Sequence, residues 1–209
     1  MALNEEILHD LLEINAVQLS PDEYFTWTSG IKSPIYCDNR LIMSYPEIRK
    51  KIIKSFINIM EEEKLLPDVI AGCATAGIPH AAWLSTELNL PMVYVRSTPK
   101  GHGKENQIEG LIQSGSKVLV IEDLISTGGS SIEAAHAVKA SGAEVIGVLA
   151  IFSYGLEKTE ENFAHAGYSY HTITNFDKLL DELVKRNGIT IEEKSKMLDW
   201  RKNLNFINN

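Results

Sequence analysis

The chain has 209 residues and a mass of 23.3 kDa, which fits one globular domain that needs no disulfide or metal to hold its core. Its net charge of -8 argues against broad binding to nucleic acid or anionic membranes, and a hydrophobic content of 44% argues against disorder. The absence of a signal peptide pattern, of an apolar run of about 18 residues and of metal-type spacing between Cys37 and Cys73 leads us to expect a cytoplasmic protein that binds neither membranes nor nucleic acid.

The amino-terminal part predicts a helix, a short hairpin and a second helix. Apolar residues at helical spacing predict the first helix from Asn4 to about Asn15. The aromatic and polar stretch over residues 24–38 predicts a hairpin or loop pair that turns at Ser29-Gly30. A long helix is predicted from about Pro46 to Lys64, because proline is tolerated in a first turn and apolar residues then recur every four positions.

From residue 68 onward, short apolar strands alternate with helices. The predicted strands cover residues 68–72, 91–96, 117–121 and 144–152, and the helices between them cover residues 78–88 and 130–141. Continuous apolar strands separated by helices are typical of a parallel sheet that is covered on both faces, so we expect an α/β fold.

The chain divides into three parts of one domain, residues 1–209. We expect a first helix and a small hood in about residues 1–45, a core sheet in about 46–175, and a helical tail in about 176–209. The second tail helix opens with a capping box, in which Thr190 is followed three residues later by Glu193. The tail helices are expected to contribute packing.

One strand end carries an unusual group of residues. Glu122 and Asp123 directly follow an apolar run, and a series of hydroxyls and glycines then leads into a helix that opens with a capping box from Ser130 to Glu133. Ligands of parallel sheets bind beyond the carboxyl ends of strands, and the N–H groups of a helix start bind anions. A phosphate cradle beside two carboxylates that accept hydrogen bonds from a diol indicates a ribose 5-phosphate. The alternative, a plain turn with surface acids, leaves the acid pair unexplained.

Two further strand ends carry candidate binding loops. Residues 72–79 are small and enter a helix, which fits either an anion-binding turn or a tight packing turn. Arg96, Lys100, His102 and Lys104 lie in a glycine-containing stretch of an otherwise acidic chain. That pattern indicates a mobile lid over an anion, and the alternative is a solvated run of charges.

These motifs resemble those of a known family. The segment from Glu122 to Ser130 resembles the phosphoribosyl pyrophosphate motif of type I phosphoribosyltransferases. The stretches over residues 96–110, 74–79 and 25–36 are similar to those of orotate phosphoribosyltransferases, and the resemblance covers roughly residues 3 to 155. It implies the type I phosphoribosyltransferase fold, a central and mostly parallel sheet flanked by helices, with a small amino-terminal hood and carboxyl-terminal helices.

The resemblance also implies an activity, a cofactor and an assembly. A member of this family transfers the 5-phosphoribosyl group from phosphoribosyl pyrophosphate to orotate, which gives orotidine 5′-monophosphate and pyrophosphate in pyrimidine (UMP) synthesis. It uses Mg²⁺ held mainly by substrate and water, so no protein residue is expected to be a metal ligand. It is a homodimer in which the lid covers the neighbouring subunit's site.

Matching residues receive their expected roles from the resemblance. The expected catalytic residues are Lys100, His102 and Asp123, and Lys100 is the group that neutralises or protonates the leaving pyrophosphate. Orotate contacts are expected from Lys32, Tyr36 and Ser126. The residues expected to contact phosphoribosyl pyrophosphate are Arg96, Lys100, His102, Lys104, Thr75, Ala76, Glu122, Asp123, Leu124, Ile125, Ser126, Thr127, Gly128, Gly129 and Ser130.

The sequence departs from some relatives at three places. It has Thr28 where they carry a lysine, Ser97 where they carry a second basic residue, and no arginine near residues 152–154. We therefore expect Lys32 or main-chain N–H groups to hold the orotate carboxylate. Two rival interpretations are a purine phosphoribosyltransferase, which would lack the segment over residues 29–34 and this lid, and a non-catalytic regulator, which would carry an added nucleic-acid-binding module and lose the lid lysines.

Overall fold

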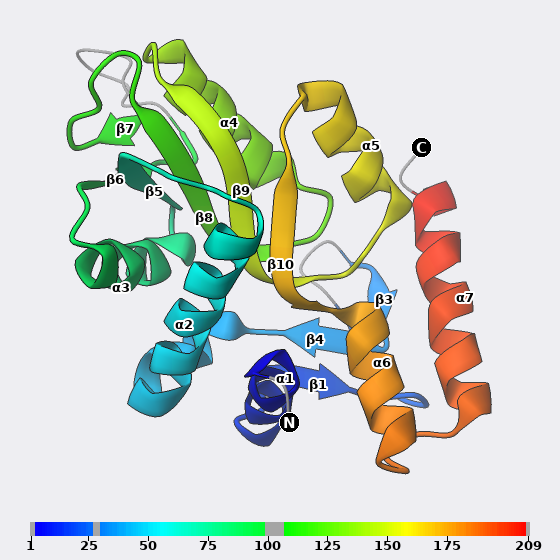
Figure 1. Cartoon of the computed structure of the whole chain (residues 1–209). Coiled ribbons are helices and arrows are strands. Elements are labelled where there is room, and N and C mark those ends of the chain that lie inside the picture. The colour runs from blue at the N-terminus through cyan, green and yellow to red at the C-terminus, as the bar shows by residue number, and fades with distance from the viewer. Residues whose placement is uncertain (1–2, 27–29, 99–106, 208–209) are drawn as a thin grey trace.

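The computed structural model describes residues 3–26, 30–98 and 107–207. A six-stranded sheet forms its centre, in the order β10-β9-β8-β5-β6-β7 (Figure 1). The strands are β5 (Val69–Cys73), β6 (Met92–Val95), β7 (Ile108–Glu109), β8 (Lys117–Ile125), β9 (Glu144–Ser153) and β10 (Tyr170–Asn175). All neighbouring pairs are parallel except β6 and β7, which confirms the expected mostly parallel sheet.

Helices cover both faces of the sheet, as the apolar strands predicted. They are α1 (Leu3–Glu13), α2 (Pro46–Glu62), α3 (Gly77–Leu88), α4 (Gly129–Ala140), α5 (Glu157–Ala166), α6 (Phe176–Lys185) and α7 (Ile191–Ile207). Alternate residues of β8 point to opposite faces. Leu119 and Ile121 join an apolar cluster with α1, α2, α3 and α6, whereas Val118 and Val120 join a second cluster with α4 and α5. The central strand is therefore buried on both sides.

The amino-terminal hood lies across the end of the sheet where β10 leads into α6 (Figure 1). In it, β1 (Val17–Leu19) pairs with β4 (Ile35–Cys37), and β2 (Phe25–Thr26) pairs with β3 (Lys32–Ser33), both antiparallel. A short 3-10 helix, Asn39–Ser44, follows β4. The predicted hairpin is confirmed, with Gly30 at φ +83°, a backbone region that favours glycine. Ser29 of the predicted turn and Thr28 lie outside the described residues.

Several elements differ from the sequence-based expectations. The segment expected as one loop over residues 97–110 contains β7, and β8 continues four residues further than predicted, so the acid pair lies within a strand. Helix α5 and strand β10 were not predicted, because both are largely polar and neither shows a continuous apolar run. In the described ranges, no helix combines the length and the apolar character needed to cross a bilayer.

Only one of the two predicted capping boxes forms. At the start of α7, the Thr190 N–H and hydroxyl donate to Glu193, and the Glu193 N–H donates back to Thr190 Oγ1 at 3.1 Å. The box predicted between Ser130 and Glu133 is wrong. Helix α4 is capped by Gly128 at φ +84° without a side-chain hydrogen bond, and the Ser130 hydroxyl donates to Glu122 instead.

Candidate active site

The acid pair lies near the end of β8, and Glu122 is only 6% exposed. Its Oε1 accepts a hydrogen bond from the Asp123 N–H at 3.0 Å, and its Oε2 accepts one from Ser130 Oγ at 3.2 Å. Burial, reinforced by the charge of Asp123, raises the pKa of Glu122 to about 8, and burial also raises the pKa of Asp123. A ligand that donates hydrogen bonds to these two carboxyl groups, or that brings positive charge near them, would favour their ionised forms.

The hood contacts the acid pair directly. The buried Asn39 donates from its side-chain amide to the Asp123 main-chain oxygen at 2.8 Å. Its neighbours Asp38 and Arg40 form a two-point ion pair with N–O distances of 2.6 and 2.8 Å, and this hydrogen bonding holds the pKa of Asp38 below its usual range. A hydrogen bond therefore joins the hood to the strand that carries the acid pair.

The turn over residues 126–130, here called the phosphate turn, leads from β8 into α4. Because α4 begins at Gly129, the first N–H groups of the helix have no carbonyl partner one turn earlier. The left-handed backbone of Gly128 brings these groups to the end of the strand, and Ser126 Oγ accepts a bond from the Thr127 N–H at 2.6 Å. Such a helix start is suited to an anion.

Helix α5 holds the phosphate turn from behind. The Thr159 hydroxyl donates to the Ser126 carbonyl oxygen, and the Asn162 amide donates to that of Thr127 at 2.9 Å. The Phe163 ring covers Gly128 so closely that a Cβ there would lie 2.5 Å from Cε2. These α5 side chains share one helix face, and sequence reasoning missed them. In the sequence, the only local feature that relates these residues is their spacing of three and four positions, which places them on one helix face.

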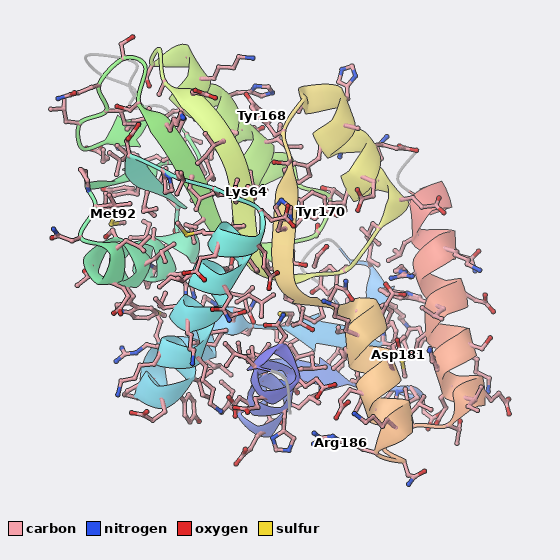
Figure 2. The ribbon with its side chains drawn as sticks, in the orientation of Figure 1. Lys64, Met92, Tyr168, Tyr170, Asp181 and Arg186 are labelled. Carbon is pink, nitrogen blue, oxygen red and sulfur yellow. The ribbon has the colours of Figure 1, made fainter. Side chains whose placement is uncertain are left out.

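Tyr170 fixes α5 to the sheet. This residue, labelled on β10 in Figure 2, donates from its hydroxyl to Glu160 at 2.5 Å. Its ring lies 4.4 Å from that of Phe163, centroid to centroid. The helix that holds the phosphate turn is therefore itself bonded to a strand of the central sheet.

The loop between β5 and α3 comes close to the acid pair. The peptide bond between Ala74 and Thr75 is cis, and the Ala74 N–H donates to the Val95 oxygen at 2.9 Å. A Cβ on Gly77 would lie 2.4 Å from the Ile121 main-chain oxygen, so only glycine allows α3 to begin so close to β8. The structure thereby places the start of α3, which follows Thr75 and Ala76, next to the strand residue that precedes Glu122.

The base of the predicted lid is described, whereas its centre is not. Arg96 pairs its N–H with the Gln107 oxygen at 2.9 Å, and its guanidinium lies 3.5 Å from a Glu109 carboxylate oxygen. Strand β7 therefore anchors the arginine at the end of β6. The residues Lys100, His102 and Lys104 lie outside the described residues, so their placement stays a prediction.

Comparison with known proteins decides the family. A family model described as "Phosphoribosyl transferase domain" matches residues 42–177. An orotate phosphoribosyltransferase of Oceanobacillus iheyensis is 59% identical over 202 residues, which are 97% of this chain and 100% of the relative. The chain belongs to the orotate phosphoribosyltransferase family. It is accordingly a pentosyl-transferring enzyme, as the motifs predicted.

Solved structures confirm the expected type I phosphoribosyltransferase fold. An orotate phosphoribosyltransferase from Aeropyrum pernix aligns with a TM-score of 0.75 and 26% identity, over 85% of this chain and 97% of that one. The UMP synthase of Leishmania donovani aligns with a TM-score of 0.78 and 27% identity. This alignment covers 95% of the present chain, which spans 42% of the longer synthase.

In this member of the family, the residues expected to contact orotate lie on the hood and the phosphate turn. Tyr36 is 37% exposed, and its ring centroid lies 5.8 Å from that of Phe25. Burial raises the pKa of Tyr154, and the charge of Asp123 acts in the same direction. Lys32 is exposed on β3.

The tail of this phosphoribosyltransferase forms hydrogen bonds with the hood and with the residue that follows β9. Trp200 on α7 donates from its indole N–H to the Lys32 main-chain oxygen at 2.9 Å. The next residue, Arg201, pairs with Asp177 and reaches the Tyr154 carbonyl oxygen at 3.4 Å. Sequence reasoning missed these residues because nothing in the tail indicates which distant strand it contacts.

Proposed function

We propose that this member of the orotate phosphoribosyltransferase family transfers the 5-phosphoribosyl group of phosphoribosyl pyrophosphate to orotate. The products are orotidine 5′-monophosphate and pyrophosphate, in pyrimidine (UMP) synthesis. The observation that carries the proposal is the acid pair Glu122-Asp123, which lies near the end of β8 just before the phosphate turn. A ribose 5-phosphate has a diol and a phosphate at its two ends, and here the acid pair offers acceptors for the diol and the turn offers N–H donors for the phosphate.

The proposed catalysis depends on positioning and charge. The C1′–oxygen bond to pyrophosphate breaks ahead of attack by the orotate ring nitrogen, so positive charge develops on the ribose. Glu122 and Asp123 hold the ribose hydroxyls, the phosphate turn holds the 5′-phosphate, and the loop with Thr75 and Ala76 holds pyrophosphate. Such fixed groups lower the barrier without a covalent protein nucleophile.

Magnesium fits the chemistry of this site. Mg²⁺ takes hard oxygen ligands and retains waters. A nearby cation would also offset the cost of ionising the two buried carboxyl groups. We propose that donor oxygens and water hold most of its coordination, with the acid pair reaching it through the ribose hydroxyls. When bound, the ion offsets negative charge on the leaving pyrophosphate.

The lid and the dimer complete the proposal. Arg96, anchored by β7, contacts pyrophosphate together with Lys100, His102 and Lys104, and Lys100 neutralises or protonates the leaving group. We propose a homodimer in which each lid covers the neighbour's site. Ser126, Lys32 and Tyr36 bind orotate. The expected cytoplasmic location stays a prediction.

The test is base preference with the purified chain. With Mg²⁺ and phosphoribosyl pyrophosphate present, we expect the ultraviolet absorbance of orotate to fall while one pyrophosphate appears for each orotate consumed. Adenine and hypoxanthine serve as controls and should remain unchanged, because a purine enzyme would consume them instead. Lys100→Ala should bind the donor but lose about 10²-fold or more in kcat, the size typical of lost charge stabilisation. Near-normal kcat would remove Lys100 from the chemistry.

A further inference from the structure

Helix α7 connects the hood strand that carries Lys32 to the end of the central sheet. Trp200 bonds the Lys32 carbonyl oxygen at 2.9 Å across 168 residues of sequence. Arg201 bonds the carbonyl oxygen of Tyr154, which follows β9 directly, and pairs with Asp177 on α6 at 2.8 Å. Two adjacent residues of one helix thus contact the hood and the end of β9.

Both α7 residues that make these hydrogen bonds also pack against Phe176. The Trp200 ring meets the fully buried Phe176 ring edge-on at 6.2 Å between centroids, and the Arg201 guanidinium lies 5.7 Å from the same ring. Gly155 makes room for the arginine, since a Cβ there would lie 3.0 Å from Nη1. The ion pair with Asp177 neutralises the arginine charge, so Arg201 acts here as an anchor rather than as a ligand for orotate.

Strand β3 is short. It has two residues and, among the described residues, pairs with the equally short β2, and such a pair is marginal by itself. A hollow of about 520 Å³ lies between the hood and α7, with Tyr24, Ile31 and Leu204 among its lining residues. Beside this hollow, the hydrogen bond from Trp200 is a directional contact from α7 to the Lys32 main chain, in addition to the pairing of Lys32 with Thr26.

We infer that Trp200 is a positioning residue for orotate recognition, which acts by holding the Lys32 main chain so that the lysine side chain meets the orotate carboxylate. The inference rests on the proposed function, in which Lys32 faces orotate. It assigns α7 a role in base affinity, whereas the phosphoribosyl donor is bound by β8 and the phosphate turn and should not depend on it.

Trp200→Phe tests the inference, because it keeps an aromatic ring against Phe176 and removes only the N–H donor. Losing one such hydrogen bond costs about 1 kcal/mol, so we expect the orotate KM to rise roughly fivefold. The KM for phosphoribosyl pyrophosphate and the kcat should stay within about twofold of wild type. Trp83→Phe is the matched control, since this tryptophan lies on α3 under Arg49 and away from the hood.

A double-mutant cycle separates positioning from general damage. If Trp200 acts through Lys32, Trp200→Phe should change the orotate KM less than twofold in a Lys32→Ala background. Three results would each overturn the inference. The first is that the effects of Trp200→Phe and Lys32→Ala on the orotate KM multiply in the double mutant. The others are that Trp200→Phe raises the KM values for orotate and the donor equally, or that it leaves the orotate KM normal. A wild-type chain that leaves orotate unconsumed would instead overturn the proposed function.

Discussion

The side-chain amide of Asn162 donates a hydrogen bond to the main-chain carbonyl oxygen of Thr127 at 2.9 Å, and so ties helix α5 to the phosphate turn. Thr159 does the same for Ser126, and both acceptors lie in the turn that precedes α4. A carbonyl oxygen facing a phosphate would repel it. By engaging these oxygens, α5 leaves main-chain N–H groups to face the anion.

Asn162→Leu should therefore weaken donor binding specifically. The change removes the hydrogen-bond partner of the half-buried Thr127 carbonyl, and the loss of such a bond costs about 0.5–1.5 kcal/mol. We expect the KM for phosphoribosyl pyrophosphate to rise roughly tenfold while the orotate KM stays within twofold, as measured by initial rates with each substrate varied. Glu161→Gln is the control, because this neighbour is exposed on α5. An unchanged donor KM in folded Asn162→Leu would contradict the role.

The sequence predicted the candidate site but not the α5 residues that hold the phosphate turn in place. Glu122, Asp123 and the turn after them are contiguous, and a buried strand followed by glycines and hydroxyls is a local pattern. Thr159 and Asn162 act on the turn from 33 and 35 residues away. On a polar helix such residues look like surface positions, because their partners are main-chain oxygens that leave no mark on the sequence.

The failed capping box shows how a long-range contact displaces a local one. Ser130 was predicted to cap α4 with Glu133, a reasonable pattern for an isolated helix. In the fold, the buried Glu122 carboxylate lies 3.2 Å from the Ser130 hydroxyl and accepts its hydrogen bond. An unpaired polar group costs more free energy when it is buried, as the Glu122 carboxyl group is, than when it lies at an exposed helix start. The tertiary hydrogen bond therefore replaces the predicted capping box.

Gly77→Ala should damage both stability and activity. The added methyl group would lie 2.4 Å from the Ile121 main-chain oxygen and 3.2 Å from Glu122 Cα, and neither backbone atom can move without shifting the acid pair. Overpacking of this kind typically costs about 1–3 kcal/mol. We expect a lower Tm in thermal unfolding and a fall in kcat/KM of about tenfold or more.

Gly147→Ala is the matched control for this substitution. Gly147 lies in β9, and a Cβ there would meet its nearest neighbours at 3.4 to 3.8 Å, which is ordinary contact. This variant should keep its activity and nearly its full Tm. Equal losses in both variants would show that any added methyl group disturbs the sheet, and would remove the special role of the close approach at Gly77.

Glu122 should make the ligand-free protein less stable as pH rises. Its pKa is raised from 4.5 to about 8 in the fold, so the folded state binds more protons than the unfolded state between these values. Stability from this group is therefore complete below about pH 4.5 and is lost as pH rises through 8, and the raised pKa of Asp123 acts in the same direction. Glu122→Gln stays neutral, so its Tm relative to wild type should increase between pH 5 and 8.5.

Donor binding should have the opposite dependence on pH, because the ribose hydroxyls need ionised acceptors. We expect the affinity of the wild type for phosphoribosyl pyrophosphate, measured by calorimetry with Mg²⁺, to rise between pH 6 and 8.5 more steeply than that of Glu122→Gln. Comparing the two proteins removes the titration of the donor itself. Glu133→Gln, an exposed change on α4, should follow the wild type. Identical slopes for wild type and Glu122→Gln would show that this carboxyl group does not lose its proton when the donor binds.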